Sequence, residues 1–212
     1  MIDLLKKYED LGLIGRIDSP FRAPTVLVEK KTPGHSDDVT DRYRICIDYR
    51  SLNKNLPNSA WPAPSIEHCL DAAAGSVFLS SLDFNNGYYQ IPCTNSAKQA
   101  LAFSPGVGFT QYTFNGMPPG VKSASSVFQQ AMERTFRGLE NCMLPPYYDD
   151  INIIGRSFEE HLANARKVLE RVRQCGFTLN ALKCNFFQTR ISYLGHVIEN
   201  GTVAVDPSRS NR

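Results

Sequence analysis

Hydrophobic and polar residues alternate in two stretches near the N-terminus, and both stretches predict β-strands. In residues 25–30, Val26 and Val28 alternate with Leu27 and Glu29, and residues 43–49 run Tyr-Arg-Ile-Cys-Ile-Asp-Tyr. The residues between them, 31–41 (KTPGHSDDVTD), are almost all turn formers. The pattern therefore predicts a long hairpin with a polar tip. Basic side chains accompany this hairpin: Lys30, Lys31, Arg42, Arg44 and Arg50.

Helical spacing of apolar residues is clearest in residues 157–175. Ser157 and Glu160 have the spacing of a capping box, and Gly176 stands where a helix commonly ends. The same reasoning predicts helices at 3–11, 65–74, 97–103 and 123–139, and strands at 77–83, 109–114 and 191–198. Because strands and helices are mixed and hairpins occur, the pattern favours an α+β fold over a doubly wound parallel sheet.

Composition narrows the class of protein. With 42% hydrophobic and 21% charged residues, the 212-residue chain is not disordered, and a net charge of +2 does not by itself indicate a nucleic-acid partner. The six cysteines include no C-x-x-C pair, so they match no zinc or redox template and predict free thiols in a reducing compartment. The N-terminus resembles no targeting segment, and no apolar run is long enough to span a bilayer. These features predict a soluble intracellular chain, cytoplasmic or nuclear, with no membrane partner.

Acidic residues stand at the ends of two apolar segments. Asp83 ends the predicted strand 77–83, and Asp149-Asp150 directly precede the hydrophobic segment 151–154 (INII), in which Asn152 is the polar residue. Asp is a favoured turn residue, so the pair alone is as readily explained by a hairpin turn. Alternatively, carboxylates from separate strands can hold two divalent ions about 4 Å apart for phosphoryl transfer, a role that Mg²⁺ suits. The spacing of the three acids does not show that they converge.

The tetrad 147–150 (Tyr-Tyr-Asp-Asp) resembles the YxDD signature of reverse transcriptases. It follows residues 81–88 (SLDFNNGY), which are similar to the first aspartate block of that family. Other blocks occur in the family's order, and the whole set runs from about residue 12 to residue 207. The chain is most similar to the polymerase of gypsy-like LTR retrotransposons, part of a Pol polyprotein. The further blocks are 19–24, 44–54, 117–120, 128–129, 160–162, 183–187 and 193–198.

The resemblance implies a right-hand polymerase fold. Residues 1–75 would form the N-terminal part of the fingers. Residues 76–207 would form a palm whose antiparallel sheet is backed by helices, with some fingers segments between about 90 and 118, and 208–212 would be a tail. The chain ends where the family continues into thumb, connection and RNase H. The resemblance therefore predicts that the thumb is absent and that the missing regions belong to a longer polyprotein.

The resemblance also implies an activity and a site. A reverse transcriptase domain adds dNMPs to a primer 3′-end on an RNA or DNA template, using two Mg²⁺ ions, with Mn²⁺ as a substitute. The catalytic and metal-binding acids would be Asp83, Asp149 and Asp150. The dNTP-binding residues would be Lys30, Lys31, Arg44, Phe84, Tyr88 and Pro119. The template–primer residues would be Gly120, Tyr147, Tyr148, Leu194 and Gly195.

Plainer interpretations of several of these residues stay open. Tyr88 matches the aromatic residue that excludes a 2′-hydroxyl, but it could simply pack within the palm. Basic hairpin tips such as Lys30 with Arg44 are commonly just solvated, and residues 193–196 could be a plain edge strand instead of a primer-holding hairpin.

Departures from the family pattern support an alternative function. Pro119 stands where relatives carry Gln or Phe, and it lacks a backbone donor. Pro145-Pro146 should shorten the strand before the tetrad, because proline cannot donate to a ladder. Tyr148 is bulkier than usual, and the tip at 31–41 is longer. With the absent thumb, these departures suggest a weak or inactive remnant that at most binds nucleic acid. An RNA-templated RNA polymerase is disfavoured by Tyr88.

Overall fold

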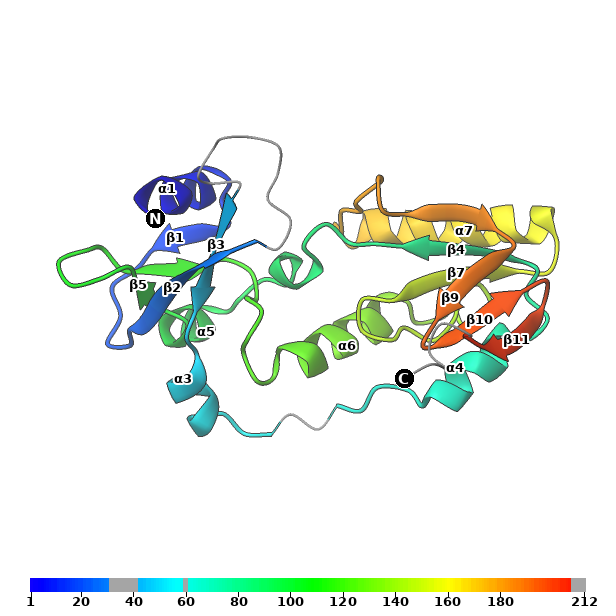
Figure 1. Cartoon of the computed structure of the whole chain (residues 1–212), viewed down its shortest axis with the longest axis horizontal. Helices are drawn as coiled ribbons and strands as arrows, with labels where there is room; N and C mark the ends of the chain where they lie inside the picture. Colours follow the sequence, from blue (N-terminus) through cyan, green and yellow to red (C-terminus); the bar gives the residue numbers. More distant parts are fainter. Residues whose placement is uncertain (31–41, 59–60, 207–212) are drawn as a thin grey trace. The chain divides into compact units, whose positions relative to one another are not determined.

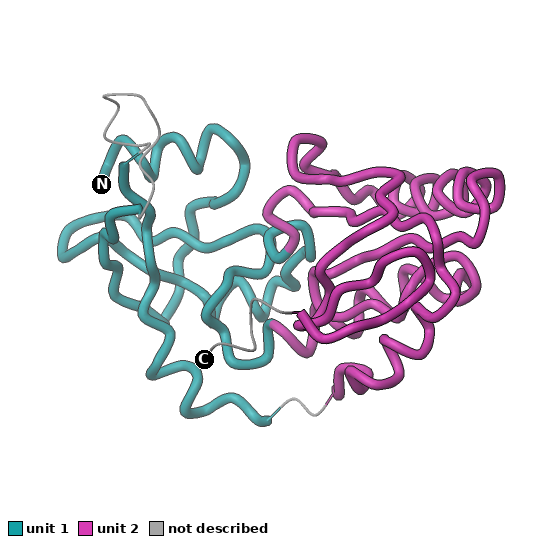
Figure 2. Tube along the Cα trace, turned by 45° about the vertical axis from the view of Figure 1, so that its right-hand side comes forward, with its two compact units in different colours: residues 1–59, 88–124 teal, residues 60–87, 125–212 magenta. Residues whose placement is uncertain are grey.

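The computed structural model describes residues 1–30, 42–58 and 61–206, which form two compact units (Figures 1 and 2). Unit 1 comprises residues 1–59 and 88–124, and unit 2 comprises residues 60–87 and 125–212. Each unit is therefore built from two separate segments of the chain, so neither is complete until distant residues have come together.

Unit 1 is organised around a five-stranded sheet with strand order β1-β6-β5-β2-β3. All neighbouring strands in it are antiparallel except the β2–β5 pair. Its core combines residues of α1 with residues of the sheet, among them Leu4, Ile14, Phe103 and Phe114. The elements are α1 (Ile2–Asp10), β1 (Ile14–Arg16), β2 (Ala23–Glu29), β3 (Tyr43–Ile47), α3 (Arg50–Asn55), α5 (Asn95–Ala100), β5 (Phe103–Ser104) and β6 (Tyr112–Phe114).

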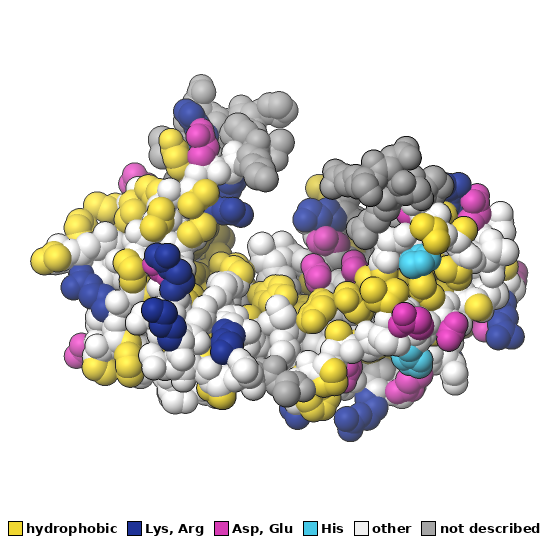
Figure 3. Space-filling model, turned by 60° about the horizontal axis from the view of Figure 1, so that its bottom comes forward, with side chains coloured by type: hydrophobic (Ala, Val, Ile, Leu, Met, Phe, Trp, Pro, Cys, Tyr) yellow, Lys and Arg dark blue, Asp and Glu magenta, His cyan; other side chains and the backbone are white. Residues whose placement is uncertain are grey.

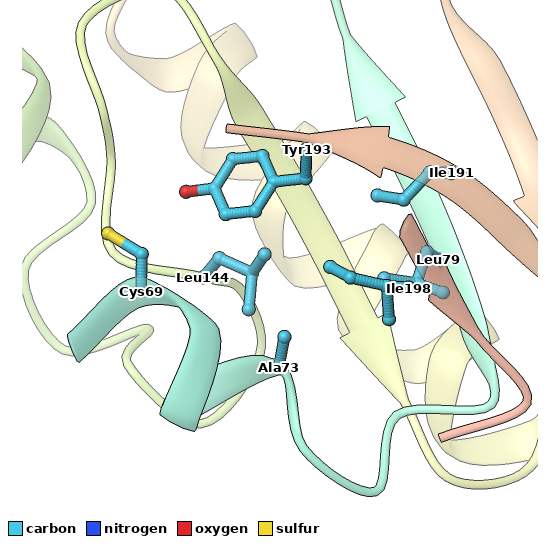
Figure 4. Close-up of a cluster of buried hydrophobic side chains, with 7 residues drawn as sticks. All are labelled: Cys69, Ala73, Leu79, Leu144, Ile191, Tyr193 and Ile198. Carbon is cyan, nitrogen blue, oxygen red and sulfur yellow. The ribbon is translucent and has the colours of Figure 1, made fainter. Parts of the chain in front are cut away.

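Unit 2 contains two three-stranded antiparallel sheets, with orders β7-β4-β8 and β11-β10-β9. Helix α7 packs along β7 and β4 (Figure 1). A second core joins α4 to both sheets through buried side chains that include Ala73, Leu79 and Ile198 (Figure 4). The elements are α4 (Ile66–Ala73), β4 (Phe78–Leu82), α6 (Ala124–Thr135), β7 (Ile151–Gly155), α7 (Phe158–Gln174), β8 (Asn185–Gln188), β9 (Arg190–Tyr193), β10 (His196–Glu199) and β11 (Thr202–Val205), and the short 3₁₀ helix η1 (Gly87–Gln90) begins at the last residue of the first segment.

The structure confirms the predicted hairpin and the two helices with caps. Strands β2 and β3 pair with each other, and Val28 of β2 lies opposite Arg44 of β3. Their tip, residues 31–41, which includes Lys31, lies outside the described residues. In α7, Ser157 Oγ accepts from the Glu160 backbone N–H at 3.2 Å, whereas the Glu160 carboxylate accepts from the Arg156 N–H instead of that of Ser157. Helix α4 covers the predicted segment 65–74.

Several other elements differ from those that the sequence pattern predicts. The helix predicted at 97–103 starts earlier and ends at Ala100, because the fully buried Phe103 belongs to strand β5 and the unit 1 core. The strand predicted at 109–114 is shortened to β6, and the helix predicted at 123–139 ends at Thr135. The single strand predicted at 191–198 is a hairpin, β9–β10. Its two turn residues, Leu194 and Gly195, have φ of +49° and +83°, which a continuing strand cannot accommodate.

All six cysteines are free thiols, as the sequence predicts. Cys69 is fully buried, and its burial raises the pKa of its thiol. Within the described parts of the chain, no helix is both long enough and apolar enough to cross a bilayer.

Candidate functional site

The pairing of β4 with β7 places two of the predicted acids next to each other. Leu82 is the last residue of β4 and lies opposite Ile151, the first residue of β7. Asp83 directly follows Leu82, and Asp150 directly precedes Ile151. Because facing residues of an antiparallel pair are neighbours, the register brings both carboxylates to the same edge of the unit 2 sheet. Leu82 and Ile151 are buried at this end of the ladder, and that burial specifies the register.

Asp149 lies in the tight turn that leads into β7. The Tyr147 and Asp150 backbones exchange hydrogen bonds of 3.4 and 3.0 Å, so Tyr148 and Asp149 are the two connecting residues. Tyr148 has a φ of +51°, a value that is uncommon for a residue other than glycine. The Tyr147 and Tyr148 rings meet edge to face, with centroids 5.1 Å apart.

The prolines before this turn have the effect that the sequence predicts. No strand is assigned to residues 144–146, and the approach to the turn is limited to isolated bridges at Met143–Ile153 and Tyr147–Asp150. Leu144 still donates to the Asn152 carbonyl at 2.8 Å. The turn is therefore held by few ladder bonds.

The electrostatics of the edge reflect closely placed negative charges. Burial, followed by the charge of Asp149, raises the pKa of Asp150. Lys183 Nζ lies 3.8 Å from Asp83 Oδ2. The backbone of Asp83 is fixed as well, since its carbonyl accepts from the Asn180 N–H at 2.8 Å and its N–H points at Cys184 Sγ at 3.3 Å. Repulsion between acids at this edge would be relieved by a bound cation.

Carboxylate oxygens of this kind suit Mg²⁺, which takes oxygen ligands and keeps several waters. Among the described residues, no three His, Cys, Asp or Glu side chains gather closely enough to form a metal site by themselves. The protein thus offers carboxylates from two strand ends and a turn, and a metal ion held there would complete its coordination with oxygen ligands from outside these side chains.

Two other predicted residues of unit 2 lie in the β9–β10 turn. Leu194 and Gly195 connect Tyr193 to His196, which are paired across the hairpin. Positive φ at both turn residues matches a type I′ turn. Leu194 also packs against the buried cluster that contains Tyr193.

Phe84 and Tyr147 are partly or wholly packed inside unit 2. Phe84 is 6% exposed, and its ring centroid lies 5.2 Å from that of Phe177 and 6.5 Å from that of Phe128. Tyr147 packs against the same cluster as Leu194. The Phe84 side chain is therefore a core residue, which leaves its backbone as the part that could meet a ligand.

The remaining predicted residues belong to unit 1. Arg44 lies opposite Val28, and the Lys30 N–H extends the ladder by donating to the Arg42 carbonyl at 2.8 Å. Strand alternation therefore puts the exposed Lys30 and Arg44 side chains on one face of the hairpin. Tyr88 is half-buried in η1, where its carbonyl accepts from Ile91.

Pro119 and Gly120 form a turn that is fixed by a side chain of α3. Gly120 has a φ of +89°. Asn53 Nδ2 donates to the Gly120 carbonyl at 2.9 Å, and Asn53 Oδ1 accepts from the Lys122 N–H at 2.8 Å. One amide side chain thus bridges both sides of the turn.

Sequence reasoning assigned no role to Asn53, Gln129 or Lys183, although each lies in a segment that resembles the family. Gln129 is fully buried and its Oε1 accepts from the Tyr148 N–H at 2.7 Å. A buried amide in an apolar helix face was the available signal, because such a group needs hydrogen-bond partners.

A family model described as reverse transcriptase (RNA-dependent DNA polymerase) matches residues 28–198. The chain belongs to the reverse transcriptase family. It is 34% identical over 178 residues to the retrovirus-related Pol polyprotein from transposon 412 of Drosophila melanogaster, covering 84% of this chain and 14% of the relative. It is 34% identical over 207 residues to the enzymatic polyprotein of soybean chlorotic mottle virus, covering 97% and 28%. The chain therefore spans less than a third of either relative.

Solved reverse transcriptases share the fold. The foamy viral protease-reverse transcriptase in complex with dsDNA matches with a TM-score of 0.80 and 19% identity, covering 98% of this chain and 41% of that one. The same viral protein in complex with an RNA/DNA hybrid matches with a TM-score of 0.79 and 20% identity, covering 96% and 26%. The predicted α+β polymerase fold and the resemblance to retrotransposon Pol polyproteins are confirmed.

Proposed function

We propose that this chain is a polymerase domain that adds dNMPs to the 3′-end of a primer under the direction of an RNA or DNA template. The observation that carries the proposal is the β4–β7 register, which brings Asp83 and Asp150 to one sheet edge with Asp149 in the adjoining turn. Family membership indicates the class of reaction. The β4–β7 register indicates the sheet edge at which the acids would carry it out.

The roles of the acids follow from their positions. Asp83 and Asp149 would bind the two Mg²⁺ ions, which activate the 3′-hydroxyl and neutralise the phosphates in two-metal phosphoryl transfer. Asp83 lies at a strand end whose backbone is held by hydrogen bonds to residues 180–184. Asp150 adds negative charge at the same edge, where its burial and the charge of Asp149 raise its pKa.

The two compact units would correspond to the palm and the fingers of the polymerase. Unit 2 carries the acids and would be the palm, and unit 1 carries the hairpin and would be the fingers. On this assignment α4 is a palm helix, although it falls within the first 75 residues that the sequence assigned to the fingers.

The other roles are assigned by matching position. Lys30, Lys31 and Arg44 would bind the triphosphate, since a guanidinium can fork onto phosphate oxygens while lysine acts as a point charge. Tyr88 would exclude a 2′-hydroxyl, and Phe84 and Pro119 would line the dNTP site. The template–primer would contact Gly120, Tyr147, Tyr148, Leu194 and Gly195.

Nucleic acid is the partner that the surface and the structural neighbours support. On the face drawn in Figure 3, Lys and Arg side chains lie on both units, and several lie close together on the unit 1 side. Basic side chains would meet the phosphate backbone and make the affinity fall with salt. The foamy viral matches are complexes with dsDNA and with an RNA/DNA hybrid. Thumb and RNase H regions of a longer polyprotein would complete the grip on the duplex.

A second candidate function is a weak or inactive remnant that only binds nucleic acid. It is favoured by the few ladder bonds that hold the turn containing Asp149, and by the Lys183–Asp83 ion pair. Both features would make the acids slower to assemble around metal ions.

Primer extension distinguishes the two functions. The parent chain, an Asp149→Asn variant and an exposed-site control, Asp71→Asn, are given an RNA template, a DNA primer and dNTPs with Mg²⁺ or Mn²⁺. Extension by the parent and the control but not by Asp149→Asn, with equal thermal unfolding midpoints, supports the polymerase. No extension by the folded parent while template–primer is still bound supports the remnant.

A further inference from the structure

The turn that carries Asp149 is attached to helix α6 by one buried amide. Gln129 is 0% exposed, and its Oε1 accepts from the Tyr148 N–H at 2.7 Å. Its Nε2 donates to the Pro146 carbonyl at 2.8 Å and to Glu133 Oε1 at 2.8 Å. Gln129 therefore holds the backbone on both sides of Tyr147, at a place where the prolines have removed ladder bonds.

Glu133, together with the Pro146 carbonyl, fixes which way this amide points. A carboxylate can only accept hydrogen bonds, so it must face Nε2 and not Oε1 of Gln129. Glu133 lies one turn along α6 from Gln129, where side chains four residues apart are neighbours. Once Nε2 is directed to Glu133, Oε1 is left facing the Tyr148 N–H.

Trp61 in turn holds Glu133. Its Nε1–H donates to Glu133 Oε2 at 2.9 Å, so each carboxylate oxygen has one N–H donor. No Lys or Arg within the described ranges lies at ion-pairing distance from Glu133, and the two neutral donors therefore set its orientation. Trp61 is 41% exposed, so this end of the chain of hydrogen bonds reaches the surface of unit 2.

We infer that Trp61 and Glu133 are positioning residues that act through Gln129 to fix the Tyr148–Asp149 turn. The hydrogen bonds run Trp61 to Glu133, Gln129 to Glu133, and Tyr148 to Gln129. Tyr148 is held at a φ of +51°, and residues in sparsely populated backbone conformations persist only where their surroundings enforce them. The consequence for catalysis rests on the proposed function, whereas the position of the turn does not.

Amide hydrogen exchange at Tyr148 tests the inference without any substrate. In Gln129→Met, which keeps the volume but not the hydrogen bonds, exchange of the Tyr148 amide is expected to rise about tenfold, as the loss of one hydrogen bond implies. Gln174→Met, at an exposed site on α7, is the matched control and should leave the rate unchanged. The surface variant Trp61→Phe should raise the rate about threefold, and it keeps the test open if Gln129→Met fails to fold.

We call the hydrogen-bonded series Trp61–Glu133–Gln129–Tyr148 the relay. A double-variant comparison distinguishes an effect transmitted along this relay from a general loosening of the structure around the turn. Glu133→Gln has only one acceptor oxygen and cannot serve both Gln129 and Trp61. If Trp61 acts through Glu133, adding Trp61→Phe to Glu133→Gln should change the Tyr148 exchange rate no further, because the two effects share one path. Additive effects, or an unchanged Tyr148 rate in Glu133→Gln, would overturn the inference.

Kinetics link the relay to the reaction. If the parent extends primers, Trp61→Phe should lower kcat for single-nucleotide incorporation about threefold while KM for the dNTP stays the same, because the turn carries acids and not dNTP-binding side chains. A parent that does not extend while the exchange pattern holds would sink the proposed function and leave the relay standing. A parent that extends primers, with Tyr148 exchange unchanged in Gln129→Met, would overturn the inference about Trp61, Glu133 and Gln129 and leave the proposed function standing.

Discussion

The Oγ atom of Ser80 lies 2.7 Å from Nε2 of His161, and both side chains are fully buried in unit 2. Ser80 Oγ also accepts from the Phe187 N–H at 3.0 Å. This hydroxyl therefore connects α7, β4 and β8, the elements that surround the strand leading to Asp83.

The free energy of unfolding should decrease as the pH is lowered, because of His161. Burial lowers the pKa of His161 from its usual 6.5, so the folded state binds a proton less readily than the unfolded chain. The stabilisation by neutral His161 is present above about pH 6.5 and is lost as the pH falls below that value. In urea unfolding at pH 7, 6 and 5, the free energy of unfolding of the parent should drop relative to that of His161→Gln. The exposed His68→Gln should keep the parent's profile, and a parent-minus-His161→Gln difference that is constant from pH 7 to 5 would contradict the assignment.

Gly155→Ala should destabilise unit 2. A Cβ at Gly155 would lie 2.6 Å from His161 Cα and 2.7 Å from its backbone N, so α7 would have to move away from β7. Overpacking of this kind costs about 1–3 kcal/mol or more, measurable as a lower urea midpoint. Gly106→Ala is the control, since its Cβ would meet Phe109 no closer than 3.5 Å. Equal midpoints for the two variants would show that the helix yields without cost.

Lys183→Gln should lower the Mg²⁺ concentration needed for half-maximal extension. The ammonium at 3.8 Å from Asp83 Oδ2 competes with a metal ion for that carboxylate. Both side chains are substantially exposed, so the change should be only about two- to threefold. Lys167→Gln on the outer face of α7 is the control. An unchanged or higher Mg²⁺ requirement in Lys183→Gln would argue against the competition.

Tyr88→Ala should weaken the preference for dNTPs. If the ring lies under the incoming sugar, its removal makes room for a 2′-hydroxyl, and rNTP incorporation should rise relative to dNTP incorporation. Tyr88→Phe keeps the ring and should keep the preference. The measurement is single-nucleotide incorporation with each nucleotide in turn, and an unchanged ratio in Tyr88→Ala would remove Tyr88 from the proposed site.

Asn53→Ala should loosen the turn at Gly120. Without the amide, the Lys122 N–H and the Gly120 carbonyl both lose a partner, so exchange of the Lys122 amide should rise about tenfold. Asn55→Ala, in the same helix but with its amide donating to the Ser51 carbonyl, should leave the Lys122 rate unchanged. Equal Lys122 rates in the parent and Asn53→Ala would mean that the turn is held by its own backbone.

Some of this protein could be predicted from local pattern because the signals are local. Ser65 and Ser157 mark the starts of α4 and α7 through side-chain caps a few residues away, and the alternation around Val28 and Arg44 marks the hairpin. The residue pattern missed the β9–β10 turn, which only the family resemblance offered as a hairpin at 193–196, because the first residue of the turn is Leu194. Leucine is not a turn former, and Leu194 combines a positive φ with packing against the Tyr193 cluster.

The order of motifs in the sequence was enough to determine the family and to single out Asp83, Asp149 and Asp150, because chemistry restricts which residues can occupy such positions. Only the tertiary structure decided that Leu82 pairs with Ile151 and that Gln129 reaches Tyr148. Pairing between strands and contact between a helix and a turn join residues far apart in the chain, and they depend on which buried faces fit together. No periodicity within a single segment records that fit.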